Sequence, residues 1–156
     1  MENRINQSAF QVAEISISYS SKIKNSERPK LNSSREVYKV FSETWNPDTI
    51  ELLEQFKVLL LNRANRVIGL FEVSSGGVSG TIADPKLIFG TALKACASAI
   101  VLAHNHPSGN LKPSQADISL TKKIKEGGRL LDIDVLDHLI ITPEGYYSFG
   151  DEGMMF

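Results

Sequence analysis

A short apolar run in the second half of the chain constrains the fold more than any other feature of the sequence. Residues 98–103 read Ser-Ala-Ile-Val-Leu-Ala, and the chain becomes polar at His104. A run of this length without polar alternation is typical of a central β-strand that is covered on both faces. It therefore predicts a sheet with other elements packed on each side.

The patterns around this run predict an α/β or mixed α+β fold with a central mixed sheet flanked by helices. Strands are expected at 57–61 and 67–73, joined by a four-residue hairpin connection, and at 133–141 and 146–149. Helices are expected at 35–45, at 85–97 behind the N-cap Asp84, and at 114–125, where Gly127-Gly128 would end the helix. The chain's one cysteine, Cys96, is expected inside the second helix as a small core residue.

The first part of the chain has a looser pattern. Residues 1–40 are expected to form an N-terminal arm or short extension, and residues 41–156 a single domain. Within 10–19, Ile15, Ile17 and Tyr19 alternate with serines, which predicts a short strand. Residues 21–39 hold six basic and two acidic side chains. A solvated arm is the first interpretation of this stretch, and contact with nucleic acid or an acidic partner is the alternative.

Composition excludes several classes of protein. A chain of 156 residues with 42% hydrophobic positions and a net charge of −1 suits one compact domain without a global attraction to nucleic acid or anionic membrane. A single cysteine excludes an intramolecular disulfide and a zinc ribbon with four cysteines. The first residues lack the pattern of a signal peptide, and no apolar run approaches the roughly 18 residues of a membrane span. We therefore expect a cytoplasmic protein without a membrane partner.

Histidine and carboxylate side chains gather where the apolar run ends. His104 and His106 are two residues apart at a strand end, so their imidazoles point the same way. Asp117 lies in the first turn of the helix that follows. Two imidazoles and one carboxylate form the ligand set of hydrolytic zinc sites, which keep a fourth position open. The alternative interpretation of Ser114-x-x-Asp117 is a helix capping box.

A further carboxylate, Glu72, is expected on the same strand face as Ile68 and Leu70. Partial desolvation there would allow Glu72 to accept a proton as a general base, and a strand-end salt bridge is the alternative. Asp84 is the rival acid, but its place before Pro85 fits a helix cap better. His138 follows Asp137 in an apolar strand and is expected to be a hydrogen-bonded structural histidine.

These residues resemble a known family. The spacing from His104 to Asp117 matches the JAMM motif of JAB1/MPN+ metalloproteases, H-x-H-x(7)-S-x-x-D. The longer stretch 100–110, together with 137–140 and 145–149, resembles more narrowly the RadC family of bacterial JAB-domain proteins. The resemblance covers about residues 40–156. One departure is that RadC proteins often begin with a helix-hairpin-helix region, which residues 1–40 do not resemble.

The resemblance implies the JAB1/MPN fold, which is cytidine deaminase-like, and Zn²⁺ as the cofactor. It implies that His104, His106 and Asp117 are the metal ligands, that Glu72 is the general base and that Ser114 stabilises the oxyanion or the metal-bound water. The expected function is a zinc metallopeptidase or isopeptidase-like hydrolase in which activated water attacks an amide carbonyl. Its substrate would be a peptide or protein, with ubiquitin-like proteins among the candidates. The alternatives are a weakly catalytic or non-catalytic RadC-like module in DNA repair or recombination, and a purely structural zinc.

Overall fold

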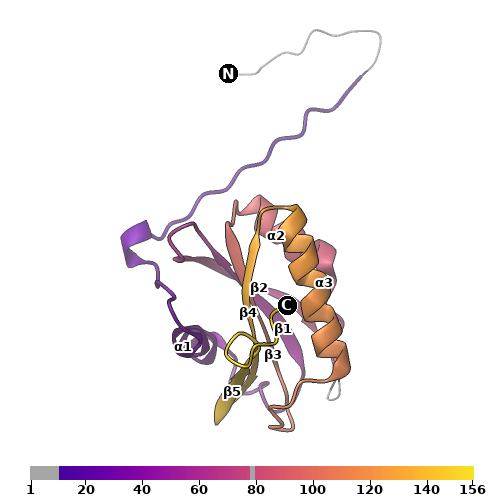
Figure 1. Cartoon of the computed structure of the whole chain (residues 1–156). Coiled ribbons are helices and arrows are strands. Elements are labelled where there is room, and N and C mark those ends of the chain that lie inside the picture. The colour runs from indigo at the N-terminus through magenta and orange to yellow at the C-terminus, as the bar shows by residue number, and fades with distance from the viewer. Residues whose placement is uncertain (1–10, 78–79) are drawn as a thin grey trace.

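The computed structural model describes residues 11–77 and 80–156, and a five-stranded sheet organises them (Figure 1). The sheet has the strand order β2-β1-β3-β4-β5, in which only β3 and β4 run parallel. Its strands are β1 (Gln55–Leu61), β2 (Val67–Ser75), β3 (Ala99–Asn105), β4 (Asp134–Thr142) and β5 (Gly145–Ser148). The helices are α1 (Ser34–Thr44), α2 (Pro85–Lys94) and α3 (Gln115–Leu130), preceded by the 3-10 turn η1 (Asn25–Glu27). The predicted mixed fold is confirmed.

Strand β3 is the centre of the sheet, as the apolar run predicts. All seven of its residues are buried, and it pairs with β1 on one side and β4 on the other. Helix α3 provides the crossover between the parallel strands β3 and β4, which is the usual way to connect such a pair. The end of β3 and the start of α3 are therefore neighbours along the chain, with only residues 106–114 between them.

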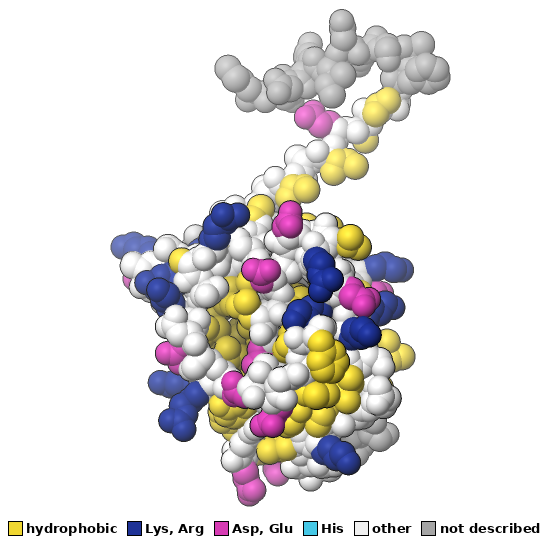
Figure 2. All heavy atoms as spheres, viewed as in Figure 1, with side chains coloured by type: hydrophobic (Ala, Val, Ile, Leu, Met, Phe, Trp, Pro, Cys, Tyr) yellow, Lys and Arg dark blue, Asp and Glu magenta, His cyan; other side chains and the backbone are white. Residues whose placement is uncertain are grey.

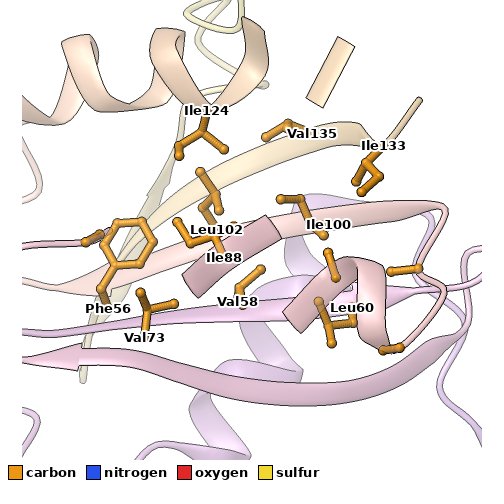
Figure 3. Close-up of a cluster of buried hydrophobic side chains, with 14 residues drawn as sticks. Phe56, Val58, Leu60, Val73, Ile88, Ile100, Leu102, Ile124, Ile133 and Val135 are labelled. Atoms are coloured by element: carbon orange, nitrogen blue, oxygen red, sulfur yellow. The ribbon is translucent and has the colours of Figure 1, made fainter. Parts of the chain in front are cut away.

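Helices α2 and α3 cover one face of the sheet. Ile88 from α2 and Ile124 from α3 pack against Val58 and Leu102 of the strands (Figure 3). These four side chains are fully buried. Burying one such side chain contributes roughly 1.5–3 kcal/mol, so this layer fixes both helices on the sheet.

Helix α1 covers the opposite face (Figure 1). Its Phe41 is fully buried in a second cluster that includes Leu59 and Leu139. Leu31 and Val37, which precede residue 41 in the chain, are also buried in this cluster. The packed body of the molecule thus includes the segment from Leu31 onward.

The strand expected within residues 10–19 is wrong for the part that the structure describes, and residue 10 lies outside it. Residues 11–20 are extended without strand pairing. Ile15 and Ile17 are 90% and 75% exposed, and Figure 2 shows hydrophobic side chains along this segment. Alternation alone does not make a strand, because the backbone also needs a partner for its hydrogen bonds.

Two helix ends differ from the prediction. Helix α2 ends at Lys94, and Cys96 is exposed with a φ of 52°, so the prediction of a core cysteine inside the helix is wrong. Leu87 of the same helix is also 49% exposed. Helix α3 continues through Gly127 and Gly128, because glycine only weakens a helix and tertiary packing compensates.

No helix among the residues that the structure describes is both long and apolar enough to span a bilayer. The cytoplasmic location stays a prediction.

Candidate metal centre

Three potential metal ligands meet where β3 ends. One donor atom from each of His104, His106 and Asp117 lies within 4.8 Å of the other two. The Nε2 atoms of the two histidines are 3.0 Å apart. The Asp117 carboxylate oxygens lie 3.3 Å from His104 Nε2 and 3.6 Å from His106 Nε2. The structure therefore brings together the three residues that the sequence nominates as ligands.

Asp117 is held in place by the first turn of α3. Ser114 is the N-cap, and its Oγ accepts a hydrogen bond from Asp117 N–H at 3.1 Å. In return, Ser114 N–H donates to Asp117 Oδ2 at 2.7 Å. The capping box and the ligand cluster thus use the same carboxylate, and the cap orients it toward the histidines.

The charges in the cluster suit a cation. Burial alone would raise the pKa of Asp117, but the close contacts of its carboxylate with the imidazoles of His104 and His106 outweigh burial and hold this pKa well below its usual range. Burial would lower the pKa of His106, yet its contacts with Asp117 and the Asn110 carbonyl raise it overall. Asp117 therefore carries its negative charge over the whole range in which an imidazole can be neutral.

The donor set fits a zinc-type ion in its chemistry. His106 Nδ1 donates to the Asn110 carbonyl at 2.5 Å, and because a carbonyl only accepts, the lone pair of His106 Nε2 faces the cluster. Two imidazoles and one carboxylate leave a tetrahedral position free for water or substrate. The side chains of His106 and Asp117 are each 15% exposed, so this position is accessible from solvent.

His138 supports the cluster from beneath. It is fully buried in β4, and its Nε2 lies 2.8 Å from His104 Nδ1. Its Nδ1 lies 2.6 Å from the Thr121 hydroxyl of α3. Burial, followed by the nearby His104, lowers the pKa of His138 well below its ordinary value. The prediction of a hydrogen-bonded histidine is confirmed, and its partner is a candidate ligand.

The structure does not bring Glu72 to this cluster. A β-bulge opposite Leu60 and Leu61 shifts the register of β2, so that Glu72 and Ile68 lie on opposite faces of the sheet. Glu72 pairs with Lys57 and accepts a hydrogen bond from Gln55 Nε2 at 2.6 Å, on the α1 face. The expectation that Ile68, Leu70 and Glu72 share one face is wrong.

The other rival acid, Asp84, caps α2 as expected. Its side chain accepts a hydrogen bond from Lys86 N–H at 2.9 Å.

Glu54 is the acidic residue that the sequence analysis missed. It precedes β1 by one residue, and its negative charge contributes to raising the pKa of His106. In the β1–β3 register, Phe56 pairs with His104, so Glu54 and His106 each lie two residues beyond this pair on the same side of the sheet. Only the antiparallel pairing of β1 with β3 reveals this neighbour, and local periodicity carries no signal for it.

Asn105, the residue between the two histidines, anchors the segment that carries Glu54. Its side chain is buried on the α1 side of β3, where Oδ1 accepts from Gln55 N–H at 2.7 Å. Its Nδ2 donates to the carbonyls of Ile50 and Leu53, both at 2.7 Å. The strand that presents the two imidazoles thus also fixes the entry into β1.

The protein has a mixed sheet with helices on both faces. It also has two histidines and an aspartate as potential metal donors at the end of the central strand. Together these features define its class as a JAB/MPN-like domain. Residues 31–154 match the family described as the RadC-like JAB domain. The chain therefore belongs to the RadC family.

Several relatives carry the name UPF0758 protein. The one from Flavobacterium johnsoniae is 54% identical over 101 residues, which are 65% of this chain and 44% of that protein. The one from Porphyromonas gingivalis is 44% identical over 130 residues, which are 82% of this chain and 56% of that protein. The one from Alkaliphilus metalliredigens is 45% identical over 102 residues, which are 65% and 44% of the two chains. The chain thus spans about half the length of the curated relatives it matches.

Proposed function

We propose that this domain is a zinc-dependent hydrolase of amide bonds, a peptidase or isopeptidase of the JAMM type. The observation that carries the proposal is the convergence of two imidazole nitrogens and one carboxylate within 4.8 Å at the end of the central strand. A zinc ion held by His104, His106 and Asp117 would supply Lewis acidity, which polarises a carbonyl and lowers the pKa of water toward about 7.

Glu54 is the residue best placed to move the proton. It is half-buried and lies near enough to His106 for its charge to raise the pKa of that histidine. A general base must lie on the face of the sheet that holds the reacting groups, which Glu54 does and Glu72 does not. Glu54 would take a proton from the attacking water and later pass it to the leaving nitrogen.

Ser114 contributes in two ways. Its Oγ accepts the Asp117 N–H, which leaves the hydroxyl proton free to donate. Because the residue is exposed at the rim of the cluster, that proton can reach an oxyanion on a bound substrate. The substrate would be a peptide or protein chain, with conjugates of ubiquitin-like proteins among the candidates.

The metal step is tested first. Purified protein is stripped with a chelator, reloaded with Zn²⁺, desalted and analysed for metal. We expect about one zinc per chain, and loss of binding in His104→Ala with the fold retained by circular dichroism. Less than a tenth of an equivalent in the wild-type protein, or an unchanged content in His104→Ala, would refute the site.

The catalytic step is tested with matched acid variants. Zinc-loaded protein is incubated with a peptide library and with isopeptide-linked ubiquitin-like conjugates, and new termini are read by mass spectrometry. Glu54→Gln should reduce kcat by at least about 100-fold, the usual scale of general-base catalysis, with zinc content unchanged. Glu72→Gln is the matched control and should keep nearly full activity. The opposite ranking would restore Glu72 as the base, and no cleavage by the zinc-loaded wild-type protein would count against a hydrolase.

The basic stretch at residues 21–39 supports a second candidate function, that of a weakly catalytic or non-catalytic module in DNA repair or recombination. Five of its six basic side chains are exposed, and the sixth, Arg28, is half-buried. Exposed cations of this kind can contact phosphates. If they do, DNA affinity should fall steeply between low and physiological salt. A shallow salt dependence would argue against phosphate contacts.

A further inference from the structure

The orientation of His104 depends on a buried hydrogen-bond chain that no part of the proposed reaction uses. Whereas His106 donates directly to a backbone carbonyl, the Nδ1 atom of His104 meets a second histidine, His138. A neutral imidazole can donate or accept at either ring nitrogen, so the contact between two histidines does not by itself say which one donates. The direction of this hydrogen bond is set by Thr121, at the other end of the hydrogen-bond chain.

Thr121 supplies that direction. Its Oγ1 lies 2.7 Å from the backbone carbonyl of Asp117, one turn earlier in α3. Because a carbonyl oxygen only accepts, the single hydroxyl proton of Thr121 is committed to this bond. The same Oγ1 lies 2.6 Å from His138 Nδ1 and can there act only as an acceptor. His138 Nδ1 must therefore carry a proton and donate it to Thr121.

The direction of the hydrogen bond between His138 and His104 follows from this proton. A neutral His138 with a proton on Nδ1 has a bare Nε2, which accepts from His104 Nδ1 at 2.8 Å. His104 then carries its proton on Nδ1, and its Nε2 lone pair faces the Nε2 of His106 and the carboxylate of Asp117. This is the only neutral tautomer in which His104 can bind a metal ion at that position.

Packing keeps the His138 ring in this orientation. The ring is 0% exposed and stacks on Phe149 at 4.7 Å between centroids. It also meets the Phe56 ring edge-on, at 5.4 Å between centroids. With aromatic rings on these sides and no water-exposed edge, a flipped ring would place a carbon where Thr121 or His104 now finds a nitrogen.

We propose that Thr121 and His138 are positioning residues that fix the tautomer of His104 and thereby present its Nε2 lone pair to the metal ion. The proposal rests on the metal site of the proposed function. Partners behind a ligating histidine typically change metal affinity by about 10–100-fold when they are removed. Without the Thr121 hydroxyl, His138 is free to move its proton to Nε2 and donate toward His104, which would leave the His104 proton on the metal side.

The test combines zinc affinity with the tautomers themselves. Zinc affinity is measured by chelator competition on wild-type protein, Thr121→Val and Thr121→Ser. We expect about 10–100-fold weaker binding in Thr121→Val and near wild-type binding in Thr121→Ser, which keeps the hydroxyl. Thr91→Val is the matched control, because Thr91 Oγ1 makes the same one-turn bond to the Leu87 carbonyl, at 2.8 Å in α2, and is not among the hydrogen-bond partners of the three histidines, all of which the structure describes.

The second measurement needs no variant. Nitrogen NMR of the zinc-free wild-type protein, at a pH above the imidazole titrations, distinguishes protonated from bare ring nitrogens. We expect His138 to carry its proton on Nδ1 and to have a bare Nε2. A proton on His138 Nε2, or wild-type zinc affinity in folded Thr121→Val, would overturn the proposal. If the wild-type protein binds no zinc, the proposed function fails, while the His138 tautomer still decides whether the hydrogen-bond chain runs as stated.

Discussion

The two glycines near the end of α3 provide a quantitative test of how this helix is seated on the sheet. A Cβ on Gly128 would lie 2.4 Å from the Ile133 carbonyl oxygen and 2.9 Å from Val135 Cγ2. A Cβ on Gly127 would meet only the Phe89 ring, with its nearest atom at 2.8 Å. A Cβ on Gly90, inside α2, would have no heavy atom within 4 Å. Alanine at these three positions therefore meets a backbone atom, a side chain and open space, respectively.

The magnitudes follow from two opposing terms. Alanine in place of a helical glycine stabilises by about 1 kcal/mol. At Gly128 the backbone oxygen cannot rotate away, so the full overpacking cost of about 3 kcal/mol applies, and Gly128→Ala should lower the free energy of unfolding by about 2 kcal/mol. At Gly127 the Phe89 ring can turn, so the two terms nearly cancel. Gly90→Ala should raise the free energy of unfolding by about 0.5–1 kcal/mol.

The assay is urea unfolding of zinc-free protein, followed by circular dichroism, with the slope m compared among the variants. The expected order of midpoints is Gly90→Ala, then wild type together with Gly127→Ala, then Gly128→Ala. A Gly128→Ala midpoint at or above that of the wild type would refute the close approach of α3 to Ile133. A changed m would mean that the variant altered the compactness of the denatured or native state, so midpoints could no longer be compared. The NMR shifts of Ile133 in the folded variants would then show whether the new methyl group displaces this residue.

Three further results are expected. Zinc binding should weaken as the pH falls, beginning above 6.5, because the pKa of His106 is raised from that ordinary value and protons compete with the metal for the neutral imidazole. Chelator competition across pH measures this effect, and an affinity independent of pH would contradict it. Asn105→Ala should lower the free energy of unfolding by about 3 kcal/mol, since it leaves several backbone groups near β1 without partners, and a loss below about 1 kcal/mol in urea unfolding would speak against the anchor. Zinc at 100 times its Kd should stabilise the wild type by about 2.7 kcal/mol in thermal or urea unfolding, and Asp117→Asn should lose most of that gain; equal gains in both proteins would mean that the metal binds elsewhere.

The candidate metal ligands could be predicted from the sequence because their positions depend on local geometry. The apolar run gives β3, a strand has a period of two, and His104 and His106 therefore point the same way. Asp117 is found because a capping pattern places it in the first turn of α3. Each step involves residues close together in the chain, so periodicity and capping suffice.

The acid could not be predicted in the same way, because its position depends on pairing between distant segments. One bulge in β2 shifts the register, which moves Leu70 and Glu72 to the face opposite Ile68. Glu54 becomes a neighbour of His106 only through the register of β1 with β3. The prediction for Cys96 was wrong for another reason. Its positive φ, after the end of α2, takes it out of the helix in which a buried position was expected.

The contacts around His104 form a closed circuit, in which every link except the one between the Asp117 carboxylate and His104 Nε2 is a hydrogen bond. From the Asp117 carboxylate the path passes through His104, His138 and the Thr121 hydroxyl, and it returns to the backbone carbonyl of Asp117 itself. Asp117, a candidate ligand, and Thr121, the last residue that supports the candidate ligand His104, thus lie one turn apart in α3. A rotation of that turn would misplace the carboxylate of Asp117 and release the imidazole of His104 together, whereas His106 is held separately by the Asn110 carbonyl. If the cluster holds a metal ion, its release and a displacement of the first turn of α3 would therefore be coupled.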